Sequence, residues 1–170
     1  MSSLSTRHLA AGAAVVASLF AAAPALAVDA GQTAPGFTLP AKDGSTTKLA
    51  DLRGKVVWVD FWASWCGPCR QSFPWMNSVI KRYPELQVVG INVDQKREDA
   101  DRFLAKTPAD FNIAFDTKGA TPTAYAAKGM PTSYLIGKDG KVLMVHSGFT
   151  SGDVPELEAS IAKALGVAPR

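Results

Sequence analysis

Residues 56–69 have the sequence VVWVDFWASWCGPC, in which apolar, β-branched and aromatic side chains are followed by two cysteines. Such a run is typical of a strand that is buried on both faces. Pro68 suits the first turn of a helix, where a backbone N–H has no partner within the helix. The stretch therefore predicts a buried strand over 55–61 that delivers Cys66 and Cys69 to the start of a helix over 67–83.

Cys66 and Cys69 are the only cysteines in the chain, and their placement favours thiol–disulfide exchange. At the N-terminus of a helix, unpaired N–H groups and the helix dipole stabilise a thiolate, so cysteines there have pKa values of roughly 3.5 to 7.5. Cys69 is expected one turn deeper and less accessible. We therefore expect Cys66 to attack a substrate disulfide and Cys69 to resolve the mixed disulfide, which leaves a Cys66–Cys69 disulfide.

Two other roles for the cysteine pair have less support. A structural disulfide across two residues closes a very small loop, so its entropic contribution to stability is low. A metal site lacks ligands, because His146 is the only histidine after residue 27. A copper carrier that uses both thiolates, with or without His146, is kept as the alternative, and no resident metal or other cofactor is expected.

The first 27 residues have the pattern of a secretory signal peptide. Arg7 precedes an apolar run from Leu9 to Ala23, and Ala25-Leu26-Ala27 supplies a small-x-small cleavage site. The run has about 15 residues, fewer than the roughly 20 that span a bilayer. We therefore predict cleavage after Ala27 and a periplasmic protein with no stable membrane anchor.

The remaining residues, 28–170, have the length of one domain. Without Arg7 the formal net charge falls from +3 to +2. A nearly balanced charge argues against nucleic acid or an anionic membrane as the main partner. Export would also place the two cysteines where disulfides form and persist.

The segments of the domain alternate between strand and helix patterns. Turn signals at 42–45 and 138–140 predict one hairpin over 37–49 and another over 133–146. Between the hairpins, the pattern predicts further strands over 86–93 and 111–115 and short helices over 98–105 and 121–127. A final helix is expected to start at Asp153, with Glu156 completing a capping box, and to stop at Gly166. This order predicts an α/β sandwich with a mixed central sheet, an N-terminal β-hairpin and flanking helices.

The segment from Val59 to Arg70 resembles the active-site segment of the thioredoxin family, with its buried acid, two tryptophans and Gly-Pro pair. Pro74 lies where the active-site helix of that family is usually kinked. The sequence Gly129-Met130-Pro131-Thr132 is similar to the family's cis-proline loop, which faces the cysteines and pairs with the substrate backbone. The resemblance implies a thioredoxin-like fold and a cis peptide bond before Pro131.

Three further stretches, 31–54, 94–130 and 131–140, are similar to the TlpA/ResA subgroup, which has an AhpC/TSA–redoxin-like domain. These are exported or membrane-tethered thiol–disulfide reductases. Their tasks include reducing apocytochrome c or the cysteines of an oxidase copper site, with electrons from a membrane thiol transporter of the DsbD/CcdA kind. The resemblance covers nearly all of 31–166 and implies that client protein disulfides are the substrates.

The dipeptide between the cysteines, Gly67-Pro68, bears on the direction of electron flow. It is similar to that of thioredoxin, whose potential is roughly −270 mV, and unlike an oxidant such as DsbA at roughly −120 mV. A thiol peroxidase (antioxidant) is a further alternative, because peroxiredoxin-like chains share the N-terminal hairpin. Those chains have a Thr three residues before the reactive cysteine, where this one has Ala63. A reductase is therefore the preferred hypothesis.

Asp60 is the second catalytic candidate. A carboxyl inside an apolar strand is desolvated, which raises its pKa and lets it exchange protons near neutral pH. The resemblance implies that Asp60 helps to deprotonate Cys69; the alternative is an acid held by structural hydrogen bonds. Trp65 and Met130 are expected to flank Cys66 as an apolar contact surface for the substrate. With Gly67, Pro68 and Pro131 they complete the predicted substrate-binding set.

The chain departs from the family in two places that concern the proton pathway. Gly90 replaces the lysine that thioredoxin has near the buried acid, and Ser72-Phe73 precede Pro74 where many TlpA-like proteins have a glutamate. Other polar and aromatic residues have plainer interpretations. Trp58 and Trp75 are expected in the core, His146 is expected to be structural, and the Lys and Arg residues between 96 and 106 are expected to form a solvated face.

Overall fold

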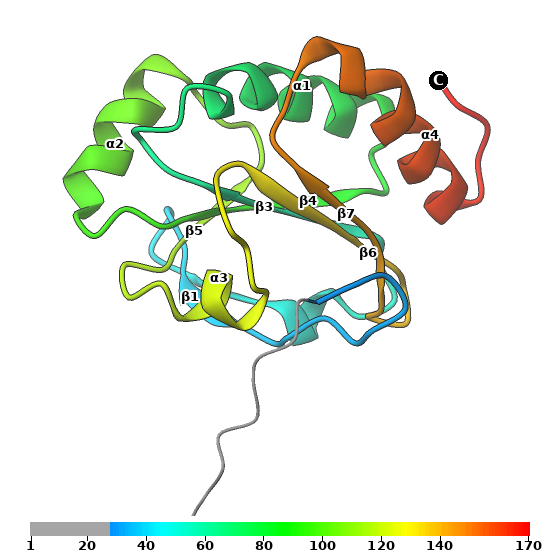
Figure 1. The fold of residues 1–170 in the computed structure, drawn as a ribbon, viewed down its shortest axis with the longest axis horizontal. Coiled ribbons are helices and arrows are strands. Elements are labelled where there is room, and N and C mark those ends of the chain that lie inside the picture. Colours follow the sequence, from blue (N-terminus) through cyan, green and yellow to red (C-terminus); the bar gives the residue numbers. More distant parts are fainter. Residues whose placement is uncertain (1–27) are drawn as a thin grey trace, which may run out of the picture.

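Strand β3 (Val57–Trp62) is the central strand of a five-stranded sheet with the order β5-β4-β3-β6-β7. The computed structural model (Figure 1) describes residues 28–170, and the predicted signal peptide lies outside them. β4 (Gln87–Asn92) pairs parallel with β3, and β5 (Asn112–Phe115) pairs parallel with β4. β6 (Thr132–Ile136) is antiparallel to β3, and β7 (Val142–Ser147) is antiparallel to β6. The mixed central sheet is therefore confirmed.

Helices cover one face of this sheet, and the N-terminal hairpin covers the other (Figure 1). The first face carries α1 (Cys69–Arg82), α2 (Arg97–Lys106) and α4 (Val154–Leu165), the last preceded by the 3₁₀ turn η2 (Ser151–Asp153). The second face carries the hairpin β1 (Thr38–Pro40) and β2 (Thr46–Lys48), the 3₁₀ turn η1 (Leu49–Leu52) and the short helix α3 (Ala120–Ala124).

Both faces of β3 are buried, and successive side chains enter two different hydrophobic clusters. Because side chains alternate along a strand, Trp58 and Trp62 point toward the helices, while Phe61 points toward the hairpin. The Trp58 ring contacts that of Trp75 edge to face, with 5.2 Å between centroids. The expectation that Trp58 and Trp75 belong to the core is confirmed.

Glu158 connects α4 to α1 within the helical layer. Its carboxylate accepts a hydrogen bond from Trp75 Nε1 at 3.0 Å and forms an ion pair with Arg82. A buried carboxylate is costly unless it is paired and hydrogen-bonded, and both conditions are met here. This contact fixes α4 against the helix that begins at Cys69.

Several predicted helix ends are wrong by one to three residues. α1 begins at Cys69, with Pro68 as its N-cap residue, so the cysteines bracket the helix start. α3 ends at Ala124, and Ala126 takes a positive φ of 54° that does not continue a helix. α4 begins at Val154. The predicted capping box is wrong as well, because the Asp153 carboxylate accepts bonds from the backbone N–H and hydroxyl of Thr150 in the preceding turn, η2.

Within residues 28–170, no helix combines enough length with enough apolar character to span a membrane.

Gly90 generates a prediction about packing in the sheet. A Cβ added there would lie 2.9 Å from Phe111 Cε2 and 3.0 Å from Ile113 Cδ1. Overpacking of a dense core costs about 1–3 kcal/mol, so Gly90→Ala should lower the free energy of unfolding by that amount. Urea denaturation measures it. The control is Gly36→Ala, because no atom lies within 4 Å of the added Cβ; an equal loss in both variants would contradict the packing explanation.

Candidate active site

Cys66 and Cys69 form a disulfide at the start of α1, with an S–S distance of 1.98 Å. The backbone N–H of Cys69 donates a hydrogen bond to Cys66 Sγ at 3.1 Å. An N–H donor and the positive end of the helix dipole both favour negative charge on this sulfur. In the disulfide form the exposed fractions are 3% for Cys66 and 0% for Cys69, so the predicted difference in access is small but has the expected sign.

A buried polar network holds the turn that precedes the cysteines. The Asp94 carboxylate accepts hydrogen bonds from the backbone N–H and the hydroxyl of Ser64, both at 2.9 Å. Asn92 Nδ2 donates to the same carboxylate at 2.7 Å. The end of β4 thereby anchors the turn two residues before Cys66. This anchor was not predicted from the sequence, although an acid directly after a predicted buried strand was a signal for it.

Asp60 lies in the middle of β3, on the helix-covered face that also carries Trp58 and Trp62. Those tryptophans belong to the hydrophobic cluster that contains both cysteines. Burial raises the pKa of Asp60 from 3.8 to about 7, and a hydrogen bond from Ser133 partly opposes the rise. Ser133 Oγ donates that bond to Asp60 Oδ1 at 2.6 Å. A carboxyl with this pKa can accept or release a proton at neutral pH.

Of the two residues opposite Asp60 on the neighbouring strands, Gly90 was predicted from the sequence and Ser133 was not. The register places Gly90 opposite Asp60 on β4 and Ser133 opposite it on β6. Trp62 occupies the space beside Gly90, with its Nε1 only 3.2 Å from an added Cβ. No cation therefore projects from Gly90 toward the carboxyl, and a neutral hydroxyl on the other neighbouring strand supplies its hydrogen bond. A serine within the otherwise apolar strand 133–136 was the available signal.

Asp60 Oδ2 has no hydrogen-bond partner among the described residues, and neither do the buried Trp58 Nε1 and Trp62 Nε1. All three atoms belong to one face of β3, the face toward α1. An unpartnered buried carboxylate oxygen is costly when ionised, which agrees with the raised pKa of Asp60.

The predicted substrate-binding residues differ in their exposure. Trp65 is 70% exposed, although most of its neighbours along the chain are buried. Met130 is half-buried and packs against both hydrophobic clusters. The Met130–Pro131 peptide bond is cis, as the resemblance implied. Gly67 and Pro68 form the link between the cysteines, and both are exposed.

His146 lies in β7 with Nε2 at 3.5 Å from Asp153 Oδ2. The copper alternative would require this imidazole near the two sulfur atoms. Among residues 28–170, no group of three or more His, Cys, Asp or Glu side chains is placed to hold a metal ion, so His146 is not grouped with Cys66 and Cys69.

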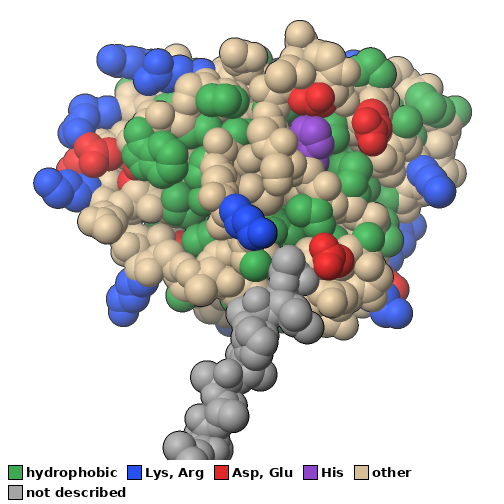
Figure 2. Space-filling model, in the orientation of Figure 1, with side chains coloured by type: hydrophobic (Ala, Val, Ile, Leu, Met, Phe, Trp, Pro, Cys, Tyr) green, Lys and Arg blue, Asp and Glu red, His purple; other side chains and the backbone are tan. Residues whose placement is uncertain are grey.

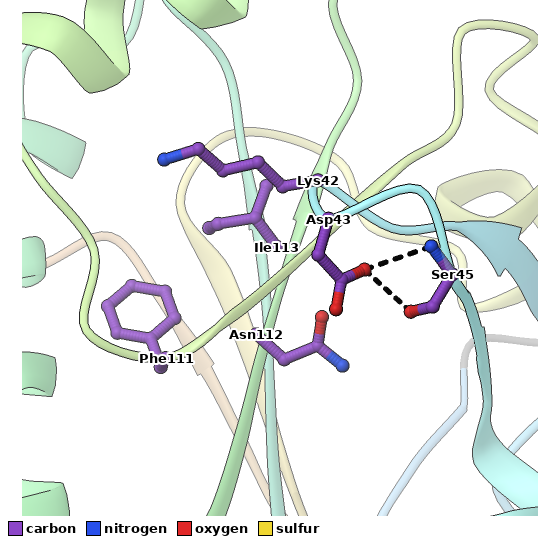
Figure 3. Close-up of a pocket in the computed structure, with 6 residues that line it drawn as sticks. All are labelled: Lys42, Asp43, Ser45, Phe111, Asn112 and Ile113. Atoms are coloured by element: carbon purple, nitrogen blue, oxygen red, sulfur yellow. Dashed lines mark hydrogen bonds between the residues drawn. The ribbon is translucent and has the colours of Figure 1, made fainter.

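A separate pocket of about 390 Å³ lies at the turn of the N-terminal hairpin and the start of β5 (Figure 3). The Asp43 carboxylate at its rim accepts hydrogen bonds from the hydroxyl and backbone N–H of Ser45, at 2.6 and 3.0 Å. The pocket contains no predicted site residue; it is lined by Lys42, Asp43, Ser45, Phe111, Asn112 and Ile113.

The chain is similar in sequence and in fold to known thiol-disulfide oxidoreductases. Residues 29–161 match the Redoxin family model. The thiol-disulfide oxidoreductase ResA of Geobacillus thermodenitrificans is 33% identical over 153 residues, which cover 88% of this chain and 87% of ResA. The crystal structure of a Chlorobium tepidum protein, proposed to be the thiol:disulfide interchange protein DsbE, is 55% identical with a TM-score of 0.80. The match covers 82% of this chain and all of that one.

A secreted disulfide oxidoreductase of Mycobacterium tuberculosis, homologous to Escherichia coli DsbE, is also similar, at 25% identity and a TM-score of 0.66. The match covers 75% of this chain and 95% of that one. The thioredoxin-like fold expected from the sequence is confirmed by these structures.

The raised pKa of Asp60 predicts how stability depends on pH. Between pH 3.8 and about 7 the folded protein keeps a proton that the unfolded chain releases, so stability should fall as pH rises through that window. The loss is up to about 4 kcal/mol at 1.36 kcal/mol per pKa unit. Asp60→Asn should remove this decline, and urea unfolding of the oxidised protein at pH 4 and pH 8 measures it. If the free energy of unfolding changes equally with pH in the wild-type protein and in Asp60→Asn, then Asp60 is already ionised from pH 4 to pH 8 and the prediction is wrong.

The Ser133 hydroxyl should lower the pKa of Asp60, since it donates to the ionised oxygen. Ser133→Ala should therefore raise that pKa by about 1, the equivalent of one hydrogen bond to a charged group. Carboxyl ¹³C NMR titration measures the change. Ser133→Thr keeps a hydroxyl and should restore the original value; an unchanged pKa in Ser133→Ala would contradict the assignment.

Proposed function

Because the chain belongs to the Redoxin family and is a thiol-disulfide oxidoreductase, we propose that it reduces disulfides in exported client proteins through Cys66 and Cys69. The observation that carries this proposal is the hydrogen bond from the Cys69 N–H to Cys66 Sγ at the start of α1. That bond distinguishes the two sulfur atoms, because it stabilises negative charge on Cys66 when the disulfide is reduced.

The reaction starts from the dithiol form. The Cys66 thiolate attacks one sulfur of the client disulfide, which forms a Cys66–client bond and releases one client thiolate. The Cys69 thiol then loses its proton, and its thiolate attacks Cys66 Sγ. The Cys66–Cys69 disulfide forms, and the second client thiolate leaves. Two electrons pass from the protein to the client, one proton leaves Cys69, and the two released client thiolates take up protons from solvent according to their own pKa values.

Asp60 is the proposed acceptor of the Cys69 proton. Its carboxyl is buried on the face of β3 that belongs to the cysteine cluster, and its pKa of about 7 allows proton exchange at neutral pH. A carboxyl with the ordinary pKa of 3.8 would be a much weaker base toward a thiol. Ser133 orients this carboxyl through its 2.6 Å hydrogen bond and thus acts as a positioning residue.

The client backbone is proposed to bind between an exposed segment and the less exposed cis-proline loop, in which Met130 is half-buried and Pro131 is buried. Trp65, with Gly67 and Pro68, supplies one wall beside Cys66, and the cis-proline loop with Met130 and Pro131 supplies the other. Trp65 supports this role because a large indole ring exposed to 70% is unusual unless it serves an interface.

The proposed setting is the periplasm. Residues 1–27 are proposed to be a signal peptide cleaved after Ala27, and 28–170 the mature domain. The similar Mycobacterium tuberculosis protein is described as secreted, which supports export. In that compartment the dithiol must be regenerated, and a membrane thiol transporter of the DsbD/CcdA kind is the proposed electron donor. Apocytochrome c or an oxidase copper site are the proposed kinds of client.

A trapping experiment tests the proposed roles of the cysteines. Without Cys69 the mixed disulfide on Cys66 cannot be resolved, so Cys69→Ala should accumulate covalent complexes with client proteins in the native periplasm. Non-reducing gels followed by mass spectrometry detect them. Cys66→Ala is the matched control and should capture no client. Equal capture by both variants would contradict the assignment of Cys66 as the nucleophile.

The reduction potential of the Cys66–Cys69 pair tests the direction of electron flow. A reductase of this kind is expected near the thioredoxin potential of roughly −270 mV. Equilibration of the purified protein with glutathione or dithiothreitol redox buffers gives the value. A potential above about −150 mV, close to that of DsbA, would instead make the protein an oxidase or isomerase.

A further inference from the structure

A cationic groove lies beside the cysteines, between the start of α1 and the length of α2. It consists of two adjoining hollows of about 220 and 270 Å³, which share Arg70, Phe103 and Lys106. The first also reaches Ser64, Asp99 and Arg102, and the second reaches Thr107. Figure 2 shows Lys and Arg side chains gathered on the side of the molecule where α2 lies, at the left of the view.

The groove borders the two segments that flank the cysteines. Ser64 is two residues before Cys66, in the turn that Asp94 anchors, and Arg70 directly follows Cys69. Ser64 lines the first hollow, and Arg70 lines both. A client segment next to a disulfide at Cys66 is therefore close along the chain to residues of the groove.

One stripe of α2 forms the far wall. Positions 99, 102, 103 and 106 are three or four residues apart, so their side chains share one face of the helix. Phe103 is the floor: it is buried and contacts the rings of Trp62 and Phe73. The hydrophobic core thus fixes the face of α2 that borders the groove, and the cations stand at its rim.

The charges along the rim do not cancel. Arg102 pairs with Asp99, the one acid of the groove. Within residues 28–170, Arg70 and Lys106 form no ion pair, and both are exposed. Two uncompensated cations therefore flank a floor of aromatic character. Such a surface complements carboxylates on an extended chain and repels basic ones.

We propose that this groove binds an acidic segment of the client protein, in extended conformation, while the client disulfide lies at Cys66. The inference rests on the proposed function and specifies the chemistry of the partner. From Asp99 to Thr107 the helix rises about 12 Å. About four residues of an extended chain cover that distance. Arg70 and Lys106 line both hollows together, so carboxylates of such a segment reach both cations where the hollows adjoin.

Peptide reduction kinetics test the proposal. Two peptides carry the same internal disulfide, one flanked by glutamates and the other by lysines. The wild-type protein should reduce the acidic peptide with about tenfold higher kcat/KM at low salt, and the preference should shrink at high salt because exposed charges are screened. Equal rates for the two peptides would overturn the proposal.

Matched charge reversals locate the effect. Lys106→Glu should lower kcat/KM for the acidic peptide about fivefold and raise it for the basic peptide. Lys163→Glu is the control, because Lys163 likewise lies in the last turn of a helix, α4, outside the groove. An equal loss of kcat/KM in the two variants would mean that net charge alone causes the effect, and would overturn the groove proposal.

A small aromatic disulfide reports on the dithiol alone. Its rate should be unchanged in Lys106→Glu, because the reagent does not reach along α2. If the wild-type protein reduces this reagent but neither peptide, the proposed protein-reductase function is wrong, and the groove proposal falls with it. If both peptides are reduced equally, only the groove proposal is wrong.

Discussion

Strand β3 is buried along its whole length, and the proposed chemistry depends on that burial. The strand can carry an apolar face toward the hairpin and another toward the helices only because the sheet is covered on both sides. Its central position also brings Cys66 and Cys69 to the start of α1. The same burial takes Asp60 out of water, and the cost of ionising it there keeps its pKa near neutrality.

The environment of Asp60 shows how neighbouring strands set the properties of one carboxyl. Gly90 presents no side chain to it, and the indole of Trp62 fills the space beside Gly90. Ser133 donates a single neutral hydrogen bond from the opposite side. A cation beside Asp60 would stabilise its carboxylate more strongly than the Ser133 hydroxyl does, and would lower the pKa of Asp60 further. Burial, with no cation at Gly90 to oppose it, therefore leaves the pKa of Asp60 near neutrality.

The nucleophile and its surroundings are held by backbone groups as much as by side chains. The Cys69 N–H polarises Cys66 Sγ, and the Asp94 carboxylate fixes the Ser64 backbone just before it. Cys66 itself is only 3% exposed in the disulfide form, whereas the neighbouring Trp65 is 70% exposed. The cationic groove extends the same exposed edge along α2, and the proposed client would then be recognised by charge as well as by its disulfide.

Local patterns in the sequence were sufficient for the cysteine pair, the buried acid and the order of strands and helices, whereas the cis-proline loop was implied by the family resemblance. These features depend on neighbours along the chain, which apolar runs, turn residues and motif spacing express directly. The same rules predicted a capping box between Asp153 and Glu156. Asp153 is the N-cap residue of α4, but its carboxylate bonds Thr150 in the preceding turn instead, which only the local backbone path decides.

Contacts between distant segments could not be predicted in the same way. The bond between Ser133 and Asp60, the anchor from Asp94 to Ser64 and the meeting of Arg70 with Lys106 each join different elements. The sequence by itself determined which residues could do redox chemistry. Only the tertiary structure decided what surrounds them, because strand register and the packing of Phe103 beneath α2 select which side chains face one another.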